Sequence, residues 1–112
     1  MQKTVGLLDP LREALQPLGS QIRAAFVYGS VASQRETAQS DIDVLIIGDQ
    51  LTYGDVFQAL ESAGHTLGRR VNPTIYTVAD FKSRVHRHNA FVTRVLQRPR
   101  LWLIGSDRDI AA

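Results

Sequence analysis

The strongest constraint on the fold is the apolar run IDVLII, residues 42–47, which ends at a glycine. Five of these six residues are apolar, and most of them are β-branched, which favours an extended strand. A nearly continuous run of this kind is typical of a strand that is buried on both faces. The run therefore predicts a layered fold in which residues 42–47 form a buried strand.

The rest of the chain alternates helical and strand patterns. Leucines recur at helical spacing near the N-terminus, and apolar residues recur at the same spacing after residue 52. The expected elements are a helix in 5–19, a strand in 22–29, a short helix after residue 30, the strand at 42–47, a helix in 52–68, a strand in 69–77, helices in 77–88 and 89–97, and a short strand or extended tail in 101–105. This order predicts an α/β (α+β) fold with a small mixed β-sheet flanked by helices.

Three local signals refine these elements. Asp9 suits the N-cap of the first helix, with Pro10 in its first turn. Pro73 restricts the strand in 69–77, because a proline without an N–H group is found at sheet edges, strand starts or bulges. Thr77 and Asp80 have the spacing of a capping box, with Asp in place of the more usual Glu, which predicts a helix start after Thr77.

Length and composition limit the class of protein. A chain of 112 residues can bury one core, so we expect a single domain over residues 1–112. The absence of cysteine excludes disulfides and thiolate metal sites, and no apolar run approaches the roughly 20 residues of a membrane span. Because the first residues lack the pattern of a secretory signal, we expect a cytoplasmic protein.

The charge is mildly positive and unevenly distributed. Thirteen Lys and Arg against eleven Asp and Glu give a formal net charge of +2, and residues 84–100 carry five arginines with no acid. Solvated helix faces account for such a run more simply than a binding surface does. The run also lacks interleaved aromatic stacking platforms, so we do not expect direct nucleic-acid binding.

Asp41 and Asp43 stand immediately before and within the buried strand. On an extended strand they point to the same face, since side chains alternate with period two. Two carboxylates about 6–7 Å apart repel each other by about 2–3 kcal/mol at an effective dielectric constant near 20. A divalent cation removes that cost, and oxygen ligands without nearby His or Cys favour Mg²⁺ or Mn²⁺. The pair therefore predicts a metal site.

Gly29 and Ser30 follow the strand expected in 22–29 and lead into a polar loop. A glycine allows a sharp turn, and backbone N–H groups at the start of a following helix would face outward beside the serine hydroxyl. This arrangement predicts a phosphate-binding turn. A phosphate-binding turn beside a metal site is the equipment of phosphoryl or nucleotidyl transfer.

At these residues the chain resembles the DNA polymerase beta nucleotidyltransferase superfamily, and within it the minimal nucleotidyltransferase domains. The likeness runs from about residue 24 to residue 105 and includes FVYGS, SDIDVLIIG, LGRRVNPTIYT and LWLIG. The resemblance implies that Gly29 and Ser30 hold the phosphates of a nucleoside triphosphate (NTP) and that Asp41 and Asp43 bind the metal. It also implies the fold of that superfamily, as one nucleotidyltransferase-like domain.

The sequence departs from the family pattern in two places. Minimal domains commonly follow the Gly-Ser turn with Ala-Arg-Gly-Glu, whereas residues 33–36 here read SQRE, so the usual arginine is absent or shifted to Arg35. The superfamily also places a third carboxylate on the strand that follows the second helix. Asn72 and Thr74 stand where that acid would be sought, and no acid occurs between Glu61 and Asp80.

Two functions follow from this resemblance. The first is a Mg²⁺-dependent enzyme that moves a nucleoside monophosphate from an NTP such as ATP to an unknown acceptor, with Asp41 and Asp43 as the catalytic, metal-binding pair. The second is a catalytically weak or inactive nucleotide-binding module of a transcriptional regulator or a toxin–antitoxin pair. Its expected partner is a helical protein or a fused winged-helix DNA-binding domain.

Overall fold

The computed structural model describes residues 3–28 and 41–110, which form four strands and several helices around them. In chain order the elements are α1 (Lys3–Leu15), a 3₁₀ helix η1 (Gln16–Gln21), β1 (Ala24–Tyr28), β2 (Ile42–Ile47), α2 (Tyr53–Leu67), β3 (Val71–Tyr76), α3 (Val78–His86), α4 (Ala90–Leu96), β4 (Leu101–Ile104) and α5 (Asp107–Ile110). The strands and long helices follow the sequence patterns, whereas η1 and α5 were not expected. The short helix expected after residue 30 lies outside the described residues.

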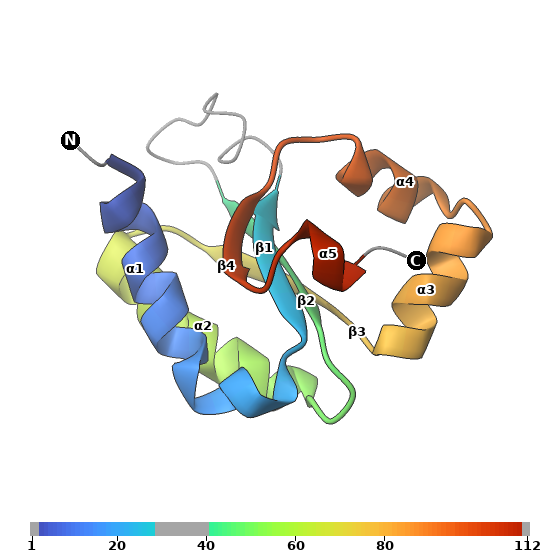
Figure 1. Ribbon diagram of the computed structural model, residues 1–112. Coiled ribbons are helices and arrows are strands. Elements are labelled where there is room, and N and C mark those ends of the chain that lie inside the picture. The colour runs from blue at the N-terminus through green and yellow to red at the C-terminus, as the bar shows by residue number, and fades with distance from the viewer. Residues whose placement is uncertain (1–2, 29–40, 111–112) are drawn as a thin grey trace.

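The four strands form one mixed sheet in the order β3-β2-β1-β4 (Figure 1). Strand β1 pairs antiparallel with both β2 and β4, whereas β2 and β3 run parallel. The parallel pair requires a crossover connection, and α2 provides it. The sheet with its flanking helices confirms the predicted fold class.

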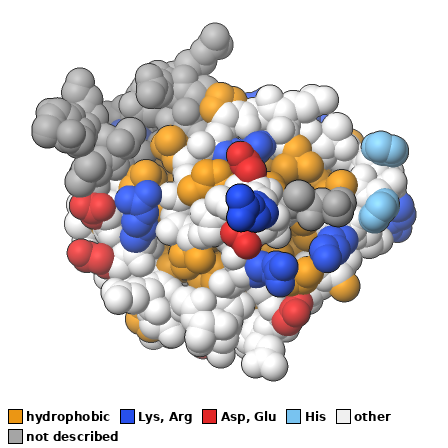
Figure 2. Space-filling model, in the orientation of Figure 1, with side chains coloured by type: hydrophobic (Ala, Val, Ile, Leu, Met, Phe, Trp, Pro, Cys, Tyr) orange, Lys and Arg blue, Asp and Glu red, His pale blue; other side chains and the backbone are white. Residues whose placement is uncertain are grey.

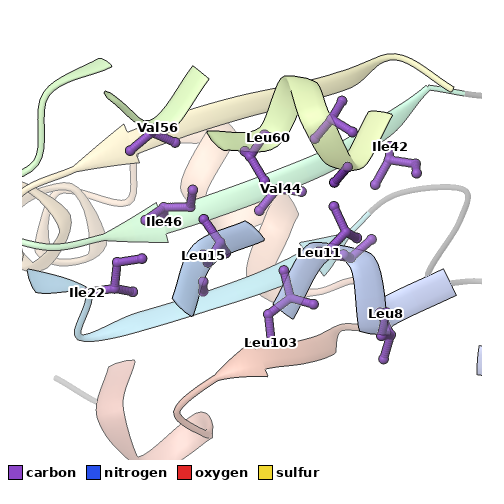
Figure 3. Packing of buried hydrophobic residues seen from close by; sticks show 14 residues of the cluster. Leu8, Leu11, Leu15, Ile22, Ile42, Val44, Ile46, Val56, Leu60 and Leu103 are labelled. Carbon is purple, nitrogen blue, oxygen red and sulfur yellow. The ribbon is translucent and has the colours of Figure 1, made fainter. Parts of the chain in front are cut away.

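One face of the sheet is covered by α1 and α2. Figure 3 shows leucines of α1 and α2 pointing toward Val44 and Ile46 of β2, with Leu103 of β4 in the same cluster. All the members of this core from β2 are fully buried. The stripe of leucines that predicted the first helix is therefore its core-facing side.

The opposite face is covered by α3 and α4 (Figure 1). Phe26, Leu45 and Ile47 point to this face, where they pack against three buried residues of the two helices, Phe81, Val92 and Val95. Since β2 supplies buried side chains to both clusters, the expectation from its apolar run is confirmed.

The structure contradicts the expectation for Pro10 and agrees with the one for Pro73. The first helix begins at Lys3, so Pro10 lies inside α1 rather than in its first turn, and Asp9 is a helical residue rather than the N-cap. Pro73 lies in β3, which is an edge strand of the sheet. The Arg70 carbonyl accepts a hydrogen bond from the Ile42 N–H, and the Tyr76 carbonyl accepts one from the Gly48 N–H. The backbone N–H and C=O groups of even-numbered residues in β3 therefore point toward β2, and the nitrogen of Pro73, which carries no hydrogen, points toward the free edge.

The helices on the second face begin at polar caps. The Thr77 hydroxyl accepts a hydrogen bond from the Asp80 N–H at the start of α3, as the sequence predicted. The side chain of Asn89 caps α4 by accepting from the Val92 N–H. Each cap satisfies one of the N–H groups that a helix start leaves without a partner.

Charged side chains are interspersed on the visible surface. Figure 2 shows Lys and Arg side chains scattered among Asp and Glu side chains and hydrophobic ones rather than gathered in one stripe. Two arginines of the basic C-terminal run form ion pairs, Arg84 with Asp80 at 3.2 Å and Arg100 with Asp107 at 3.1 Å. Within the part of the chain that the structure describes, no helix is long and apolar enough to cross a membrane.

Candidate functional site

The candidate site begins with a row of polar side chains across three strands. Asp43 of β2 is paired with Tyr28 of β1 on one side and with Asn72 of β3 on the other. Side chains at paired positions point to the same face of a sheet, so these three lie side by side. They are half-buried, whereas Asp41, just before β2, is exposed. The row lies where β1 ends and where β2 and β3 begin.

The amide of Asn72 joins the two carboxylates. Its Nδ2 donates a hydrogen bond to Oδ2 of Asp41 at 3.1 Å, and the same side chain forms a hydrogen bond with Asp43. Both carboxylates therefore lie within reach of one small group, on one face of the sheet. The period-two spacing of the two aspartates accounts for this placement.

The charge of Asp43 is costly in this position. Burial raises the pKa of Asp43, and the neighbouring Asp41 carboxylate raises it further, while the hydrogen bond from Asn72 opposes both effects. A raised pKa means that the surroundings disfavour the charged form. A bound cation would reverse that preference, so the electrostatics of the pair suit a metal ligand.

Tyr28 connects this row to the core of the second face. The hydroxyl of Tyr28 shares a hydrogen bond with Thr74 on β3, and burial raises the pKa of Tyr28. The Tyr28 ring meets Phe26 and Phe91 edge-on, with centroids 6.3 Å and 6.0 Å apart. Tyr28 is thus the strand partner of Asp43 and also packs against the second core. The sequence analysis did not assign Tyr28 to the site, although its position directly before Gly29 and Ser30 in the sequence would have indicated it.

The donors that the structure brings together fit a hard divalent cation. Two carboxylates and an amide side chain that can also present its oxygen are oxygen ligands of the kind that Mg²⁺ and Mn²⁺ prefer. Among residues 3–28 and 41–110, no group of three or more His, Cys, Asp or Glu side chains is placed to hold a metal ion. A cation here would therefore take two carboxylates from the described residues, with neutral donors beside them.

Strand register separates the two residues, Asn72 and Thr74, at which the sequence analysis sought a third acid. Asn72 pairs directly with Asp43, whereas Thr74 pairs with Leu45, one step deeper in the sheet. Asp80, which follows on α3, forms an ion pair with Arg84. Of these three residues, Asn72 is the one that touches the carboxylates. The phosphate-binding residues expected at Gly29, Ser30 and Arg35 lie outside the described residues.

Solved structures of toxin–antitoxin complexes have a similar fold. A toxin–antitoxin structure with AMP-PNP matches with a TM-score of 0.61 and 14% identity, over 91% of this chain and 76% of that one. A mutant MntA–HpeT toxin–antitoxin structure with two aspartate-to-glutamate substitutions matches with a TM-score of 0.65 and 12% identity, over the same shares. At these identities the likeness shows a shared fold.

A family match covers well over half of the sequence. Residues 11–93 match the family described as Polymerase beta, Nucleotidyltransferase, while no curated protein matches the chain. The matched range contains the two carboxylates, Asn72 and the first three strands of the sheet. The chain therefore belongs to the polymerase beta nucleotidyltransferase family.

Proposed function

We propose that this domain is a Mg²⁺-dependent enzyme that transfers a nucleoside monophosphate from an NTP to an acceptor hydroxyl. The observation that carries the proposal is the convergence of Asp41 and Asp43 on one amide at an accessible end of the sheet. The family match supports the reaction class, and the presence of AMP-PNP in a similar structure supports an NTP as the ligand.

In the proposed reaction, Asp41 and Asp43 hold the cation. Bound Mg²⁺ would offset the negative charge of the triphosphate and of the phosphoryl group in transfer. The protein's own contribution is positional. Strand pairing fixes Asp43 beside Asn72 on one side and, on the other, beside Tyr28, whose ring packs against Phe91.

We assign the triphosphate to Gly29, Ser30 and Arg35 on the grounds of the sequence. Gly29 and Ser30 follow Tyr28 directly in the sequence, and Tyr28 is the strand partner of Asp43. This proximity supports a phosphate site next to the metal site. The side chain of Ser30 would donate to a phosphate oxygen, and Arg35 would add a positive charge from the loop.

Calorimetric titration tests the binding half of the proposal. Each NTP is titrated with and without Mg²⁺ into the wild-type protein and into Asp41→Asn/Asp43→Asn. We expect Mg²⁺-dependent binding to the wild type and none to the double variant. Transfer from labelled ATP in the presence of Mg²⁺ tests the catalytic half. Equal NTP affinity of both proteins would contradict the assignment of the carboxylates.

A second function is favoured by Asn72. The neutral side chain occupies the place beside Asp43 where a third acid would complete the metal site, which points to weak or absent catalysis. The domain would then bind a nucleotide and act through a partner, as one half of a toxin–antitoxin pair or as part of a transcriptional regulator. The toxin–antitoxin structures of similar fold support this alternative. Nucleotide binding without transfer to any acceptor, even with a partner present, would favour it.

A further inference from the structure

The amide of Asn72 contacts two groups that repel each other. Its N–H group donates to Asp41 at 3.1 Å and its side chain also bonds Asp43. An amide N–H carries a partial positive charge, so it interacts favourably with both carboxylates without adding a net charge of its own. In the protein without metal, Asn72 thus offsets part of the repulsion that a cation would otherwise remove.

The backbone gives Asn72 little freedom to leave this position. Asn72 lies inside β3 at the position paired with Asp43, and the Arg70 carbonyl just before it accepts from the Ile42 N–H. The two strands are thus tied together on both sides of the site. A rotation of the side chain about its own bonds would still turn the amide oxygen toward the carboxylates. An incoming cation must therefore displace the amide N–H group of Asn72 from the carboxylates, and breaking these contacts costs free energy.

We propose that Asn72 is a positioning residue that stabilises the metal-free Asp41–Asp43 pair and, in doing so, lowers the affinity of the site for Mg²⁺. The proposal rests on the assignment of the pair as the metal site. It implies a trade-off, because the side chain that makes the empty site stable also competes with the cation. An acid at this position would have the opposite effects, since it repels the pair and adds a ligand.

The test measures melting temperature (Tm) against a Mg²⁺ series that starts from protein in EDTA. The central variant is Asn72→Asp, which replaces the donor by an acceptor of nearly the same shape. Asn72→Ala removes the donor without adding charge. Asn89→Asp is the matched control, because it makes the same chemical change at the N-cap of α4, where Asn and Asp serve equally well.

Four results are expected. In EDTA at neutral pH, Asn72→Asp lowers Tm by at least about 4 °C and Asn72→Ala lowers it less. The Mg²⁺ concentration needed for half of the stabilisation falls about tenfold in Asn72→Asp. Asn89→Asp changes neither quantity. A fourth variant, Asp41→Asn/Asn72→Asp, exchanges the amide and the carboxylate, and it should regain part of the Tm lost in EDTA.

Two outcomes would overturn the proposal. If Asn72→Asp melts in EDTA at the wild-type temperature or above it, the amide does not stabilise the empty pair. If its Mg²⁺ midpoint stays at the wild-type value, the amide does not compete with the cation. A wild-type protein that does not respond to Mg²⁺, NTP or labelled ATP would instead contradict the proposed function, while the comparison in EDTA would still decide whether Asn72 bridges the carboxylates.

Discussion

Strand β2 contributes different kinds of side chain to the two faces of the sheet. On the face toward α1 and α2, Ile42, Val44 and Ile46 of β2 are fully buried. On the face toward α3 and α4, the next residues of β2 are Asp43, Leu45 and Ile47, and only the last two are buried. The second face is therefore a core over most of its length and a polar site at one end.

This difference assigns stability and chemistry to different parts of the fold. A continuous apolar face contributes burial free energy at every position. The polar end of the other face gives up that contribution at Asp43 and also costs free energy through burial of a charge beside Asp41. A domain of this size can tolerate that cost because the first face is apolar from end to end.

The largest effect is expected from a change on the fully covered face. Leu60 of α2 is 1% exposed and belongs to the core between α2 and the sheet. Leu60→Ala should lower the free energy of unfolding by about 2–5 kcal/mol, because it removes buried methyl groups and leaves a cavity. Urea denaturation measures the loss. The Mg²⁺ midpoint of the molecules that remain folded should not change, and a shift would mean that the two faces are coupled.

The next effect concerns catalysis at the polar end. We expect the wild type to transfer nucleotide slowly or not at all, and Asn72→Asp to raise the transfer rate at least about tenfold, which corresponds to about 1.4 kcal/mol. Thr74→Asp is the matched control, since Thr74 pairs with Leu45 and bonds Tyr28 instead of the carboxylates. A labelled-ATP assay with Mg²⁺ compares the three proteins. Robust wild-type turnover with no gain from either substitution would show that two carboxylates suffice.

A smaller effect is expected at the boundary between core and site. Tyr28→Phe removes the hydroxyl that bonds Thr74 but keeps the ring contacts with Phe26 and Phe91. The free energy of unfolding should fall by about 1 kcal/mol. Thr74→Val should cost a similar amount, and the double variant should cost less than the sum, because both changes remove one interaction. Strictly additive losses would show that the hydrogen bond contributes nothing.

The smallest change in stability is expected at Asp43 itself. Burial, and to a lesser degree the Asp41 carboxylate, raise the pKa of Asp43 in the folded protein. The contribution of Asp43 to stability is therefore fully present below the ordinary pKa of Asp, and it is lost as the pH rises through the raised pKa. In EDTA, the melting temperature of Asp43→Asn should therefore equal that of the wild type below about pH 4. Near neutral pH it should be the same or slightly higher. Stabilisation by Mg²⁺ should disappear. Strong destabilisation in EDTA, with no Mg²⁺ response in either protein, would show that the pair is structural.

Local patterns predicted most of the elements but misplaced one helix end. The cap at Thr77 and the apolar run of β2 both depend on chemistry within a few residues. The start of α1 was wrong because Asp9 and Pro10 suit a helix start, yet the helix continues through them. Packing of Leu8 and Leu11 against the first core favours helix on both sides of the proline, and this tertiary contribution outweighs the local signal.

For the candidate site, the sequence by itself predicted the two aspartates and determined that they share a face, because the period of a strand places alternate side chains together. It also predicted that Asn72 and Thr74 stand where a third acid would be sought. Only the tertiary structure decided between them, because the parallel register of β2 and β3 puts Asn72 beside Asp43 and Thr74 beside Leu45. Register depends on the packing of whole strands against two layers of helices, and it is not encoded in the few residues of any one motif.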